Sequence, residues 1–140
     1  MKQTLAIVKP DAFAAGKAGD ILAHLQAAGF RLIACKVIHM TAMQARAFYQ
    51  VHAERPFYNS LVEFMTSGPC MPLALERSDA VPFLRQTMGA TDPAKAEEGT
   101  VRKKFAESIE RNAIHGSDSA ENAEKELAFF FSKVELVGAM

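Results

Sequence analysis

Tryptophan is absent from the 140-residue chain, and cysteine occurs only twice. The two cysteines, Cys35 and Cys70, stand far apart in apolar stretches, and neither has a zinc-type set of ligands beside it in the sequence. Thiols in such surroundings are commonly buried and inert, and free cysteines are typical of a reducing compartment. We therefore expect two buried free thiols, with no disulfide and no structural metal.

Neither sign of charge is in excess. Sixteen Lys and Arg side chains offset sixteen Asp and Glu side chains. A protein that wraps a nucleic acid usually carries a basic excess or a basic stripe. The balance therefore favours a small ligand, and we expect no stable nucleic-acid partner.

Long apolar runs are also missing. The chain opens on a short strand-like run, residues 4–9, without the features of a leader segment, and no stretch approaches the length of a membrane-spanning helix. We expect a cytoplasmic protein with no membrane association. Hydrophobic residues make up 49% and charged residues 23% of the chain, which is the composition of an ordinary globular protein. We expect one domain, residues 1–140.

Four runs of strand type divide the chain: residues 4–9, 31–40, 72–76 and 113–115. A helical pattern follows each of the four, and the second and third are followed by more than one helical piece. Without these extra pieces the order is β-α-β-β-α-β. The sequence therefore predicts an α+β fold, a ferredoxin-like sandwich built on a four-stranded antiparallel sheet with added helices.

Capping residues predict where two helices begin. Thr41 with Gln44, and Asp118 with Glu121, each match the pattern of a capping box, in which the two side chains satisfy free backbone amides at the helix start. Four apolar side chains are expected to form the buried face of the last helix: Ala120, Ala123, Leu127 and Phe130.

Four histidines are candidates for chemistry: His24, His39, His52 and His115. The first three lie within predicted helices or strands, where an ordinary surface or edge role is the default. His115 differs because it ends a predicted strand at a turn that leads directly into a helix. Side chains and backbone amides at such a turn point outward from the sheet edge, where ligands bind. His115 is the strongest nucleophile candidate.

Glu126 and Ser117 form a possible orienting system for that histidine. Glu126 falls at the margin of the apolar stripe of the last helix, so its carboxylate needs a partner if it is partly buried. A bond from one imidazole nitrogen to a carboxylate leaves the other nitrogen as the nucleophile. The alternative is a solvated surface glutamate, and the spacing alone leaves both interpretations open.

Cations and one aromatic side chain complete the candidate set. Lys9 ends the first predicted strand, and three arginines lie at element ends beside loops, which suits donors to phosphate oxygens: Arg55, Arg85 and Arg102. An exposed arginine near a helix end is the more common interpretation for each of them. Phe57 follows a proline at a helix break, so it either stacks on a nucleobase or packs in the core beside Phe64.

Six segments in register resemble one known family. Residues 112–119, with the order Asn-Ala-Ile-His-Gly-Ser-Asp-Ser, resemble the active-site segment of the nucleoside diphosphate kinases. The resemblance extends over essentially the whole chain. It includes five further segments: residues 8–11, 54–57, 67–69, 89–93 and 99–102.

The resemblance to this family, in its bacterial type, implies a mechanism and a set of roles. His115 would take the terminal phosphate of a triphosphate on ring nitrogen Nδ1 and pass it to a diphosphate in a ping-pong cycle that maintains NTP and dNTP pools. Glu126 would orient the ring, Ser117 would bond Glu126, and Tyr49 would brace the phosphorylated histidine. The nucleotide would be held by Lys9, Asn112, Arg55, Arg85, Thr91, Arg102 and, through its base, Phe57.

Other consequences of the resemblance concern the cofactor and specificity. Mg²⁺ would arrive on the nucleotide phosphates, so no protein metal cage is needed. ATP and other nucleoside di- and triphosphates would be the ligands. Stacking on Phe57 with few contacts to the base edge implies little preference among bases, and both ribo- and deoxynucleotides would be accepted.

The assembly and two rival functions complete the expectations. The chain ends at Met140 without the longer C-terminal extension of hexameric relatives, so we expect a homo-oligomer, a tetramer rather than a hexamer, with a dimer as its basic unit. One rival is a catalytically silent nucleotide-binding module on the same fold. The other is a phosphocarrier whose histidine passes phosphate to another protein.

Overall fold

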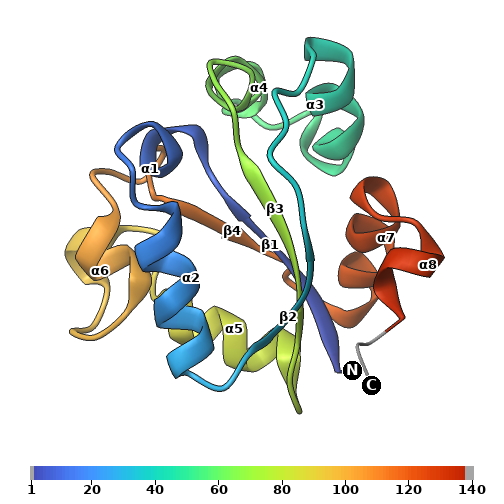
Figure 1. The fold of residues 1–140 in the computed structure, drawn as a ribbon. Helices are drawn as coiled ribbons and strands as arrows, with labels where there is room; N and C mark the ends of the chain where they lie inside the picture. Colours follow the sequence, from blue (N-terminus) through green and yellow to red (C-terminus); the bar gives the residue numbers. More distant parts are fainter. Residues whose placement is uncertain (1, 138–140) are drawn as a thin grey trace.

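The computed structural model describes residues 2–137 and contains a four-stranded sheet with helices on both faces (Figure 1). The strand order is β2-β3-β1-β4, and every neighbouring pair is antiparallel. This order confirms the predicted ferredoxin-like α+β fold. The strands are β1 (Gln3–Val8), β2 (Arg31–Cys35), β3 (Met71–Glu76) and β4 (Ile114–Gly116).

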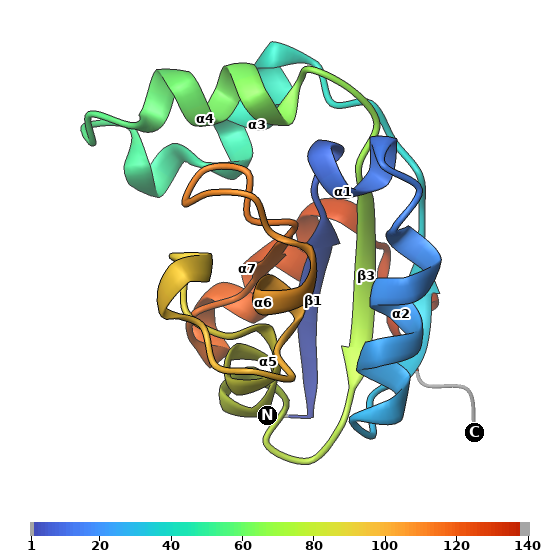
Figure 2. The ribbon, with the colours of Figure 1, turned by 90° about the vertical axis from the view of Figure 1, so that its left-hand side faces the viewer.

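Helices cover the sheet in two layers and extend beyond one end of it. α2 (Ala18–Ala27) and α5 (Ala80–Met88) pack on one face, and α7 (Ala120–Phe130) packs on the other (Figure 1). α3 (Ala42–Phe48) and α4 (Tyr58–Met65) form a helical pair beyond the end of the sheet (Figure 2). The remaining short elements are α1 (Pro10–Ala14), η1 (Gln50–His52), η2 (Pro93–Lys95), α6 (Val101–Phe105) and α8 (Lys133–Leu136).

The central position of β1 follows from its sequence. Successive side chains of a strand point to opposite faces, and here both faces are apolar. Leu5 and Ile7 belong to the core cluster beneath α7, whereas Ala6 and Val8 belong to the cluster beneath α2 and α5. All four are fully buried. A strand that is apolar on both faces gains most from a central position, and this places its end, Lys9, between the neighbouring strands.

The second strand is shorter than the sequence predicts. β2 ends at Cys35, and beyond it only an isolated bridge, Ile38 to Cys70, continues the pairing. The partner strand carries Pro72 at this point, and proline has no amide hydrogen to donate to the ladder. Cys70 is buried as predicted, but the prediction for Cys35 is wrong: it is exposed at this edge of the sheet. Both thiols are free.

The capping predictions had mixed outcomes. The capping box of Thr41 and Gln44 is present at the start of α3. The capping box predicted for Asp118 is wrong because the helix begins one residue later, with Ser119 accepting from the Asn122 amide. Ala120 is the first residue of this helix and is exposed, so the prediction of its burial is wrong, whereas the other three predicted residues of the stripe are buried.

Two short helices, α1 and α8, were not predicted. Each is five residues or fewer, which is too short for a helical period to stand out in the sequence. Within residues 2–137, no helix has the length and apolar character needed to cross a membrane.

Candidate functional site

The candidate site lies where β1 ends and β4 begins. In the antiparallel pair of these strands, Ile7 lies opposite His115. Lys9 follows β1 directly, and its amide donates to the Ala113 carbonyl at 2.9 Å. A cleft of about 350 Å³ opens beside His115. It collects most of the predicted site residues: Lys9, Tyr49, Phe57, Arg85, Thr91, Arg102, Asn112, His115 and Glu126.

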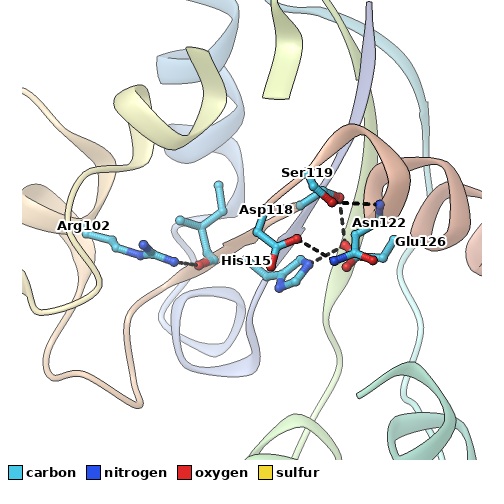
Figure 3. A network of polar contacts seen from close by, with 8 residues as sticks. Arg102, His115, Asp118, Ser119, Asn122 and Glu126 are labelled. Atoms are coloured by element: carbon cyan, nitrogen blue, oxygen red, sulfur yellow. Dashed lines mark hydrogen bonds and ion pairs between the residues drawn. The ribbon is translucent and has the colours of Figure 1, made fainter. Parts of the chain in front are cut away.

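The histidine ring is held by a carboxylate (Figure 3). Nε2 of His115 lies 2.7 Å from Oε1 of Glu126, and the Ser117 hydroxyl donates to the same oxygen at 2.8 Å. Ser117 is fully buried, and the other two side chains are each 19% exposed. An ionised carboxylate only accepts hydrogen bonds, so Nε2 carries the proton and the lone pair lies on Nδ1. Glu126 is therefore paired with His115 and is not a solvated surface glutamate.

Aromatic rings enclose the other side of the imidazole. The Phe48 ring lies 5.4 Å from the His115 ring at an interplanar angle of 69°, and the Tyr49 ring lies at 6.2 Å. The Tyr49 hydroxyl is buried and has no hydrogen-bond partner among the described residues. Burial raises the pKa of Tyr49, so the hydroxyl remains a proton donor at neutral pH. Sequence reasoning missed Phe48, because in sequence it is one of several apolar residues of a helix.

A strained turn precedes the histidine. Ala113 has φ of +73°, and the Ile114 amide donates to the Asn112 carbonyl at 2.9 Å, which closes a tight γ-turn. The Ala113 amide donates to the Asp11 carboxylate at 3.2 Å. A left-handed conformation at a residue other than glycine costs on the order of 1–3 kcal/mol. The bonds from β1 and from Asp11 hold the turn in place and carry Asn112 into the cleft.

Arg102 is a buried cation that joins two segments of the wall. Its guanidinium donates to the Gly89 carbonyl at 3.1 Å. It also donates to the Ile114 carbonyl at 2.8 Å (Figure 3). Burial, followed by the charge of Arg85, lowers the pKa of Arg102 to about 10, so it is protonated at neutral pH. Nε of Arg102 is buried without a partner among the described residues, and Arg85 itself is exposed.

Lys9 is the second buried cation. Burial, followed by the charge of Arg102, lowers the pKa of Lys9 to about 8, and the carboxylates of Asp11 and Glu110 oppose that shift. Lys9 is therefore mostly protonated at neutral pH and changes charge just above it. Two cations held in poor contact with solvent make this part of the cleft suited to an anion.

A second cavity of about 360 Å³ continues the first, since the two share Lys9, Phe57, Leu61, Thr91 and Asn112. Its walls include two large apolar side chains that are unusually exposed, Phe57 at 47% and Ile109 at 59%. Phe64, in contrast, is buried in the core. Of the two interpretations of Phe57, the structure excludes core packing and supports a surface that can stack on a planar ligand.

Arg55 and His52 differ from their neighbour Phe57 in what the sequence led us to expect of them. Arg55 is exposed and lies outside the lining of both cavities, and its role at the nucleotide stays a prediction. His52, which was given only a default surface role, lines the cleft with its ring 5.4 Å from that of Phe57. The sequence feature that could have indicated this is the position of His52 five residues before Phe57, on the other side of the helix break.

The donors of the site do not form a metal cage. Among residues 2–137, no group of three or more His, Cys, Asp and Glu side chains could hold a metal ion. The acids in the cleft are Glu126, which holds His115, and Asp118, which accepts from Asn122 at 2.6 Å. That hydrogen bond comes first among the causes that lower the pKa of Asp118, with the charge of Arg85 a smaller contribution. The arrangement suits transfer of an anionic group that brings its own counter-ion.

Comparisons with known proteins agree with this chemistry. The family model described as "Nucleoside diphosphate kinase" matches residues 2–136. A nucleoside diphosphate kinase of Rhizorhabdus wittichii is 56% identical over 137 residues, which are 98% of each chain. The solved enzyme of Aquifex aeolicus superposes with a TM-score of 0.94 at 43% identity, over 97% of this chain and 99% of that one. The enzyme of Halobacterium salinarum, solved in complex with CDP, has a TM-score of 0.93 at 37% identity, over 99% and 93%.

Proposed function

The chain belongs to the nucleoside diphosphate kinase family and is therefore a phosphotransferase, and we propose that it works by a ping-pong cycle through His115. The Nδ1 lone pair attacks the γ-phosphorus of a triphosphate. An N–P bond forms, the bond from phosphorus to the bridging oxygen breaks, and the diphosphate leaves with that electron pair. A second diphosphate then attacks the phosphohistidine and restores the free ring. The observation that carries this proposal is the 2.7 Å contact of Nε2 with Glu126, which leaves Nδ1 as the nucleophile.

The charges around the cleft support specific roles for its residues. Phosphoryl transfer is accelerated mainly by positioning and by cations placed where negative charge gathers. We propose that Arg85, Thr91 and Arg102 bind phosphate oxygens and that Tyr49 donates its unpaired hydroxyl to the phosphate on His115. Lys9 and Asn112 belong to both cavities and so are placed to meet the sugar and the phosphates.

The second cavity is proposed to hold the base, with Phe57 stacked on it. The complex of the Halobacterium salinarum relative with CDP supports a nucleoside diphosphate as the ligand. Kinases of this kind need a divalent cation, and we propose Mg²⁺ bound to the nucleotide phosphates as part of the substrate. The cationic cleft, without a metal cage among residues 2–137, suits a cation delivered in this way. The product would serve the NTP and dNTP pools.

We also propose a homo-oligomer, a tetramer built from dimers, that works in the cytoplasm. β2 is an edge strand whose outer side has no neighbour in the described sheet, and such an edge can pair with another copy. The two free thiols suit a reducing compartment.

One labelling experiment tests the proposed cycle. Incubation with γ-labelled ATP and magnesium is expected to give a phosphoprotein that is labile in acid and stable in alkali, and addition of GDP should move the label to GTP. The label is followed on denaturing gels and by chromatography of the nucleotides. Retention of the label after GDP would contradict the kinase cycle and favour a phosphocarrier. Failure to label at all would favour a silent nucleotide-binding module.

The depressed pKa of Lys9 predicts an alkaline limit to activity. Below pH 8 the ammonium group is charged and attracts the phosphates, and above it the charge is lost from the free enzyme. Since kcat/KM reports groups of the free enzyme, kcat/KM for ATP is expected to fall above pH 8, by about tenfold for each further pH unit. The measurement is a pH profile of initial rates.

A matched pair of variants tests the assignment of that limit to Lys9. Lys9→Arg keeps the charge and should move the alkaline limb upward, whereas the exposed Lys103→Gln should leave the profile unchanged. An unchanged alkaline limb in Lys9→Arg would assign that limb to another group.

The same pKa shift has the opposite effect on stability, which is expected to rise with pH where activity falls. Because the unfolded state binds the extra proton between pH 8 and 10.5, the stability of the wild type relative to Lys9→Met should rise with pH there, by up to about 3 kcal/mol.

A further inference from the structure

The proposed base cavity contains one acidic side chain, Glu110. Its lining includes Phe57, Leu61 and Ile109, which are apolar, and Glu110 is the acid among these walls. Glu110 lies on the loop between α6 and β4, which rises toward α4 in Figure 2. Glu110 is exposed, so its charge is solvated while the cavity is empty and is accessible to a ligand that enters it.

Two contacts join the loop to α4. The Ser60 hydroxyl donates to Oε2 of Glu110 at 2.6 Å, and the guanidinium of Arg111 lies 5.5 Å from the centre of the Phe64 ring. These contacts hold the carboxylate at a defined place between the loop and α4. The other oxygen, Oε1, has no hydrogen bond or ion pair within residues 2–137.

Glu110 lies on the base side of the proposed site, although its charge also reaches Lys9. It lines the second cavity but does not line the cleft that contains His115 and the arginines. If the phosphates occupy that cleft and the sugar lies near Lys9 and Asn112, the base is left to the part of the second cavity that Ile109 and Glu110 line. A carboxylate near the phosphates would weaken binding, whereas one at the base edge can strengthen it.

We propose that the free carboxylate oxygen of Glu110 accepts hydrogen bonds from the Watson–Crick edge of the base and so favours guanine nucleotides. This inference rests on the proposed function, which puts a nucleotide in the cavity. A carboxylate accepts only, and guanine presents two adjacent donors, N1–H and the 2-amino group. Adenine and cytosine present one amino group beside an acceptor nitrogen, and uracil presents one N–H between two carbonyls. Glu110 therefore changes the expectation of little base preference that stacking alone implies.

Calorimetric titration of the unphosphorylated protein with nucleoside diphosphates tests this inference without relying on catalysis. In the wild type, GDP is expected to bind about tenfold or more tightly than UDP, in keeping with the strength of hydrogen bonds to a charged group. Inosine diphosphate, which lacks only the 2-amino group, should bind more weakly than GDP. Equal binding of GDP and inosine diphosphate would overturn the proposal, and this comparison needs no variant.

Variants separate recognition of the base edge from a general effect on the cavity. Glu110→Gln should lose about tenfold in affinity for GDP while UDP changes less than about twofold. Glu107→Gln, an exposed acid on the same loop outside the cavity, is the matched control and should change neither. An equal loss for GDP and UDP, or no loss, would overturn the role of Glu110. If the labelling experiment fails while the GDP preference is present, the catalytic cycle is wrong and the base site stands.

Discussion

Replacing His115 by alanine is expected to abolish the phosphoprotein and to lower nucleotide-to-nucleotide phosphate transfer by at least about 10⁴-fold. Nδ1 of His115 is the atom that would form the covalent bond, and removing a nucleophile removes the two-step path altogether. The cations proposed to hold phosphate remain. The variant should therefore bind nucleotide almost as the wild type does, which separates loss of chemistry from loss of binding.

The variant should also fold. The imidazole is 19% exposed and packs edge-on against Phe48, so its removal leaves a small gap open to the cleft rather than an enclosed cavity. His24→Ala is the matched control, because His24 lies on α2 and lines neither cavity of the site. Its phosphoprotein level and transfer rate should match those of the wild type. Substantial transfer by His115→Ala would show that the nucleophile is a different residue.

Replacing Arg102 by methionine is expected to lower both stability and activity, whereas the same change at Arg85 should lower activity alone. Arg102 is buried and donates to the carbonyls of Gly89 and Ile114. Methionine leaves both carbonyls without their donor, which should cost about 2–4 kcal/mol of unfolding free energy. The Ile114 carbonyl directly precedes His115, so the loss also loosens the strand that carries the nucleophile.

Arg85 provides the comparison within the same cleft. It is exposed, and its removal leaves no buried group unsatisfied, so its unfolding free energy should stay within about 0.5 kcal/mol of the wild type. Each variant loses one cation from the phosphate region, which should reduce kcat by about 10²- to 10³-fold. Urea unfolding and steady-state kinetics on both proteins make the measurement. Equal stability of the two variants would contradict the bracing role of Arg102.

Local patterns in the sequence were sufficient for much of the architecture. The strand-type run at residues 4–9 predicted β1, and the spacing of Thr41 and Gln44 predicted the start of α3, because both depend on neighbours close in the chain. Prediction failed where a distant partner decides the outcome. β2 stops where its partner carries Pro72, and Cys35, on this edge strand, is exposed.

The candidate site shows the same division. His115 was singled out from its strand-end turn, and the resemblance of whole segments identified the family, because residue order alone carries that information. The spacing of Glu126 left two interpretations open, and only the packing of α7 against β1 brings its carboxylate to the ring.

By itself, then, the sequence determined the fold class and the family, and it singled out His115 as the candidate nucleophile. The tertiary structure decided which imidazole nitrogen is free, that Arg102 is a buried brace, that Arg55 lies outside the cavities, and that His52, Phe48 and Glu110 lie beside them. The physical reason is that hydrogen bonds, ring contacts and charge effects act over a few ångströms in space. In this site they join residues up to about a hundred positions apart in the chain, such as Asp11 and Ala113, and no local pattern encodes those separations.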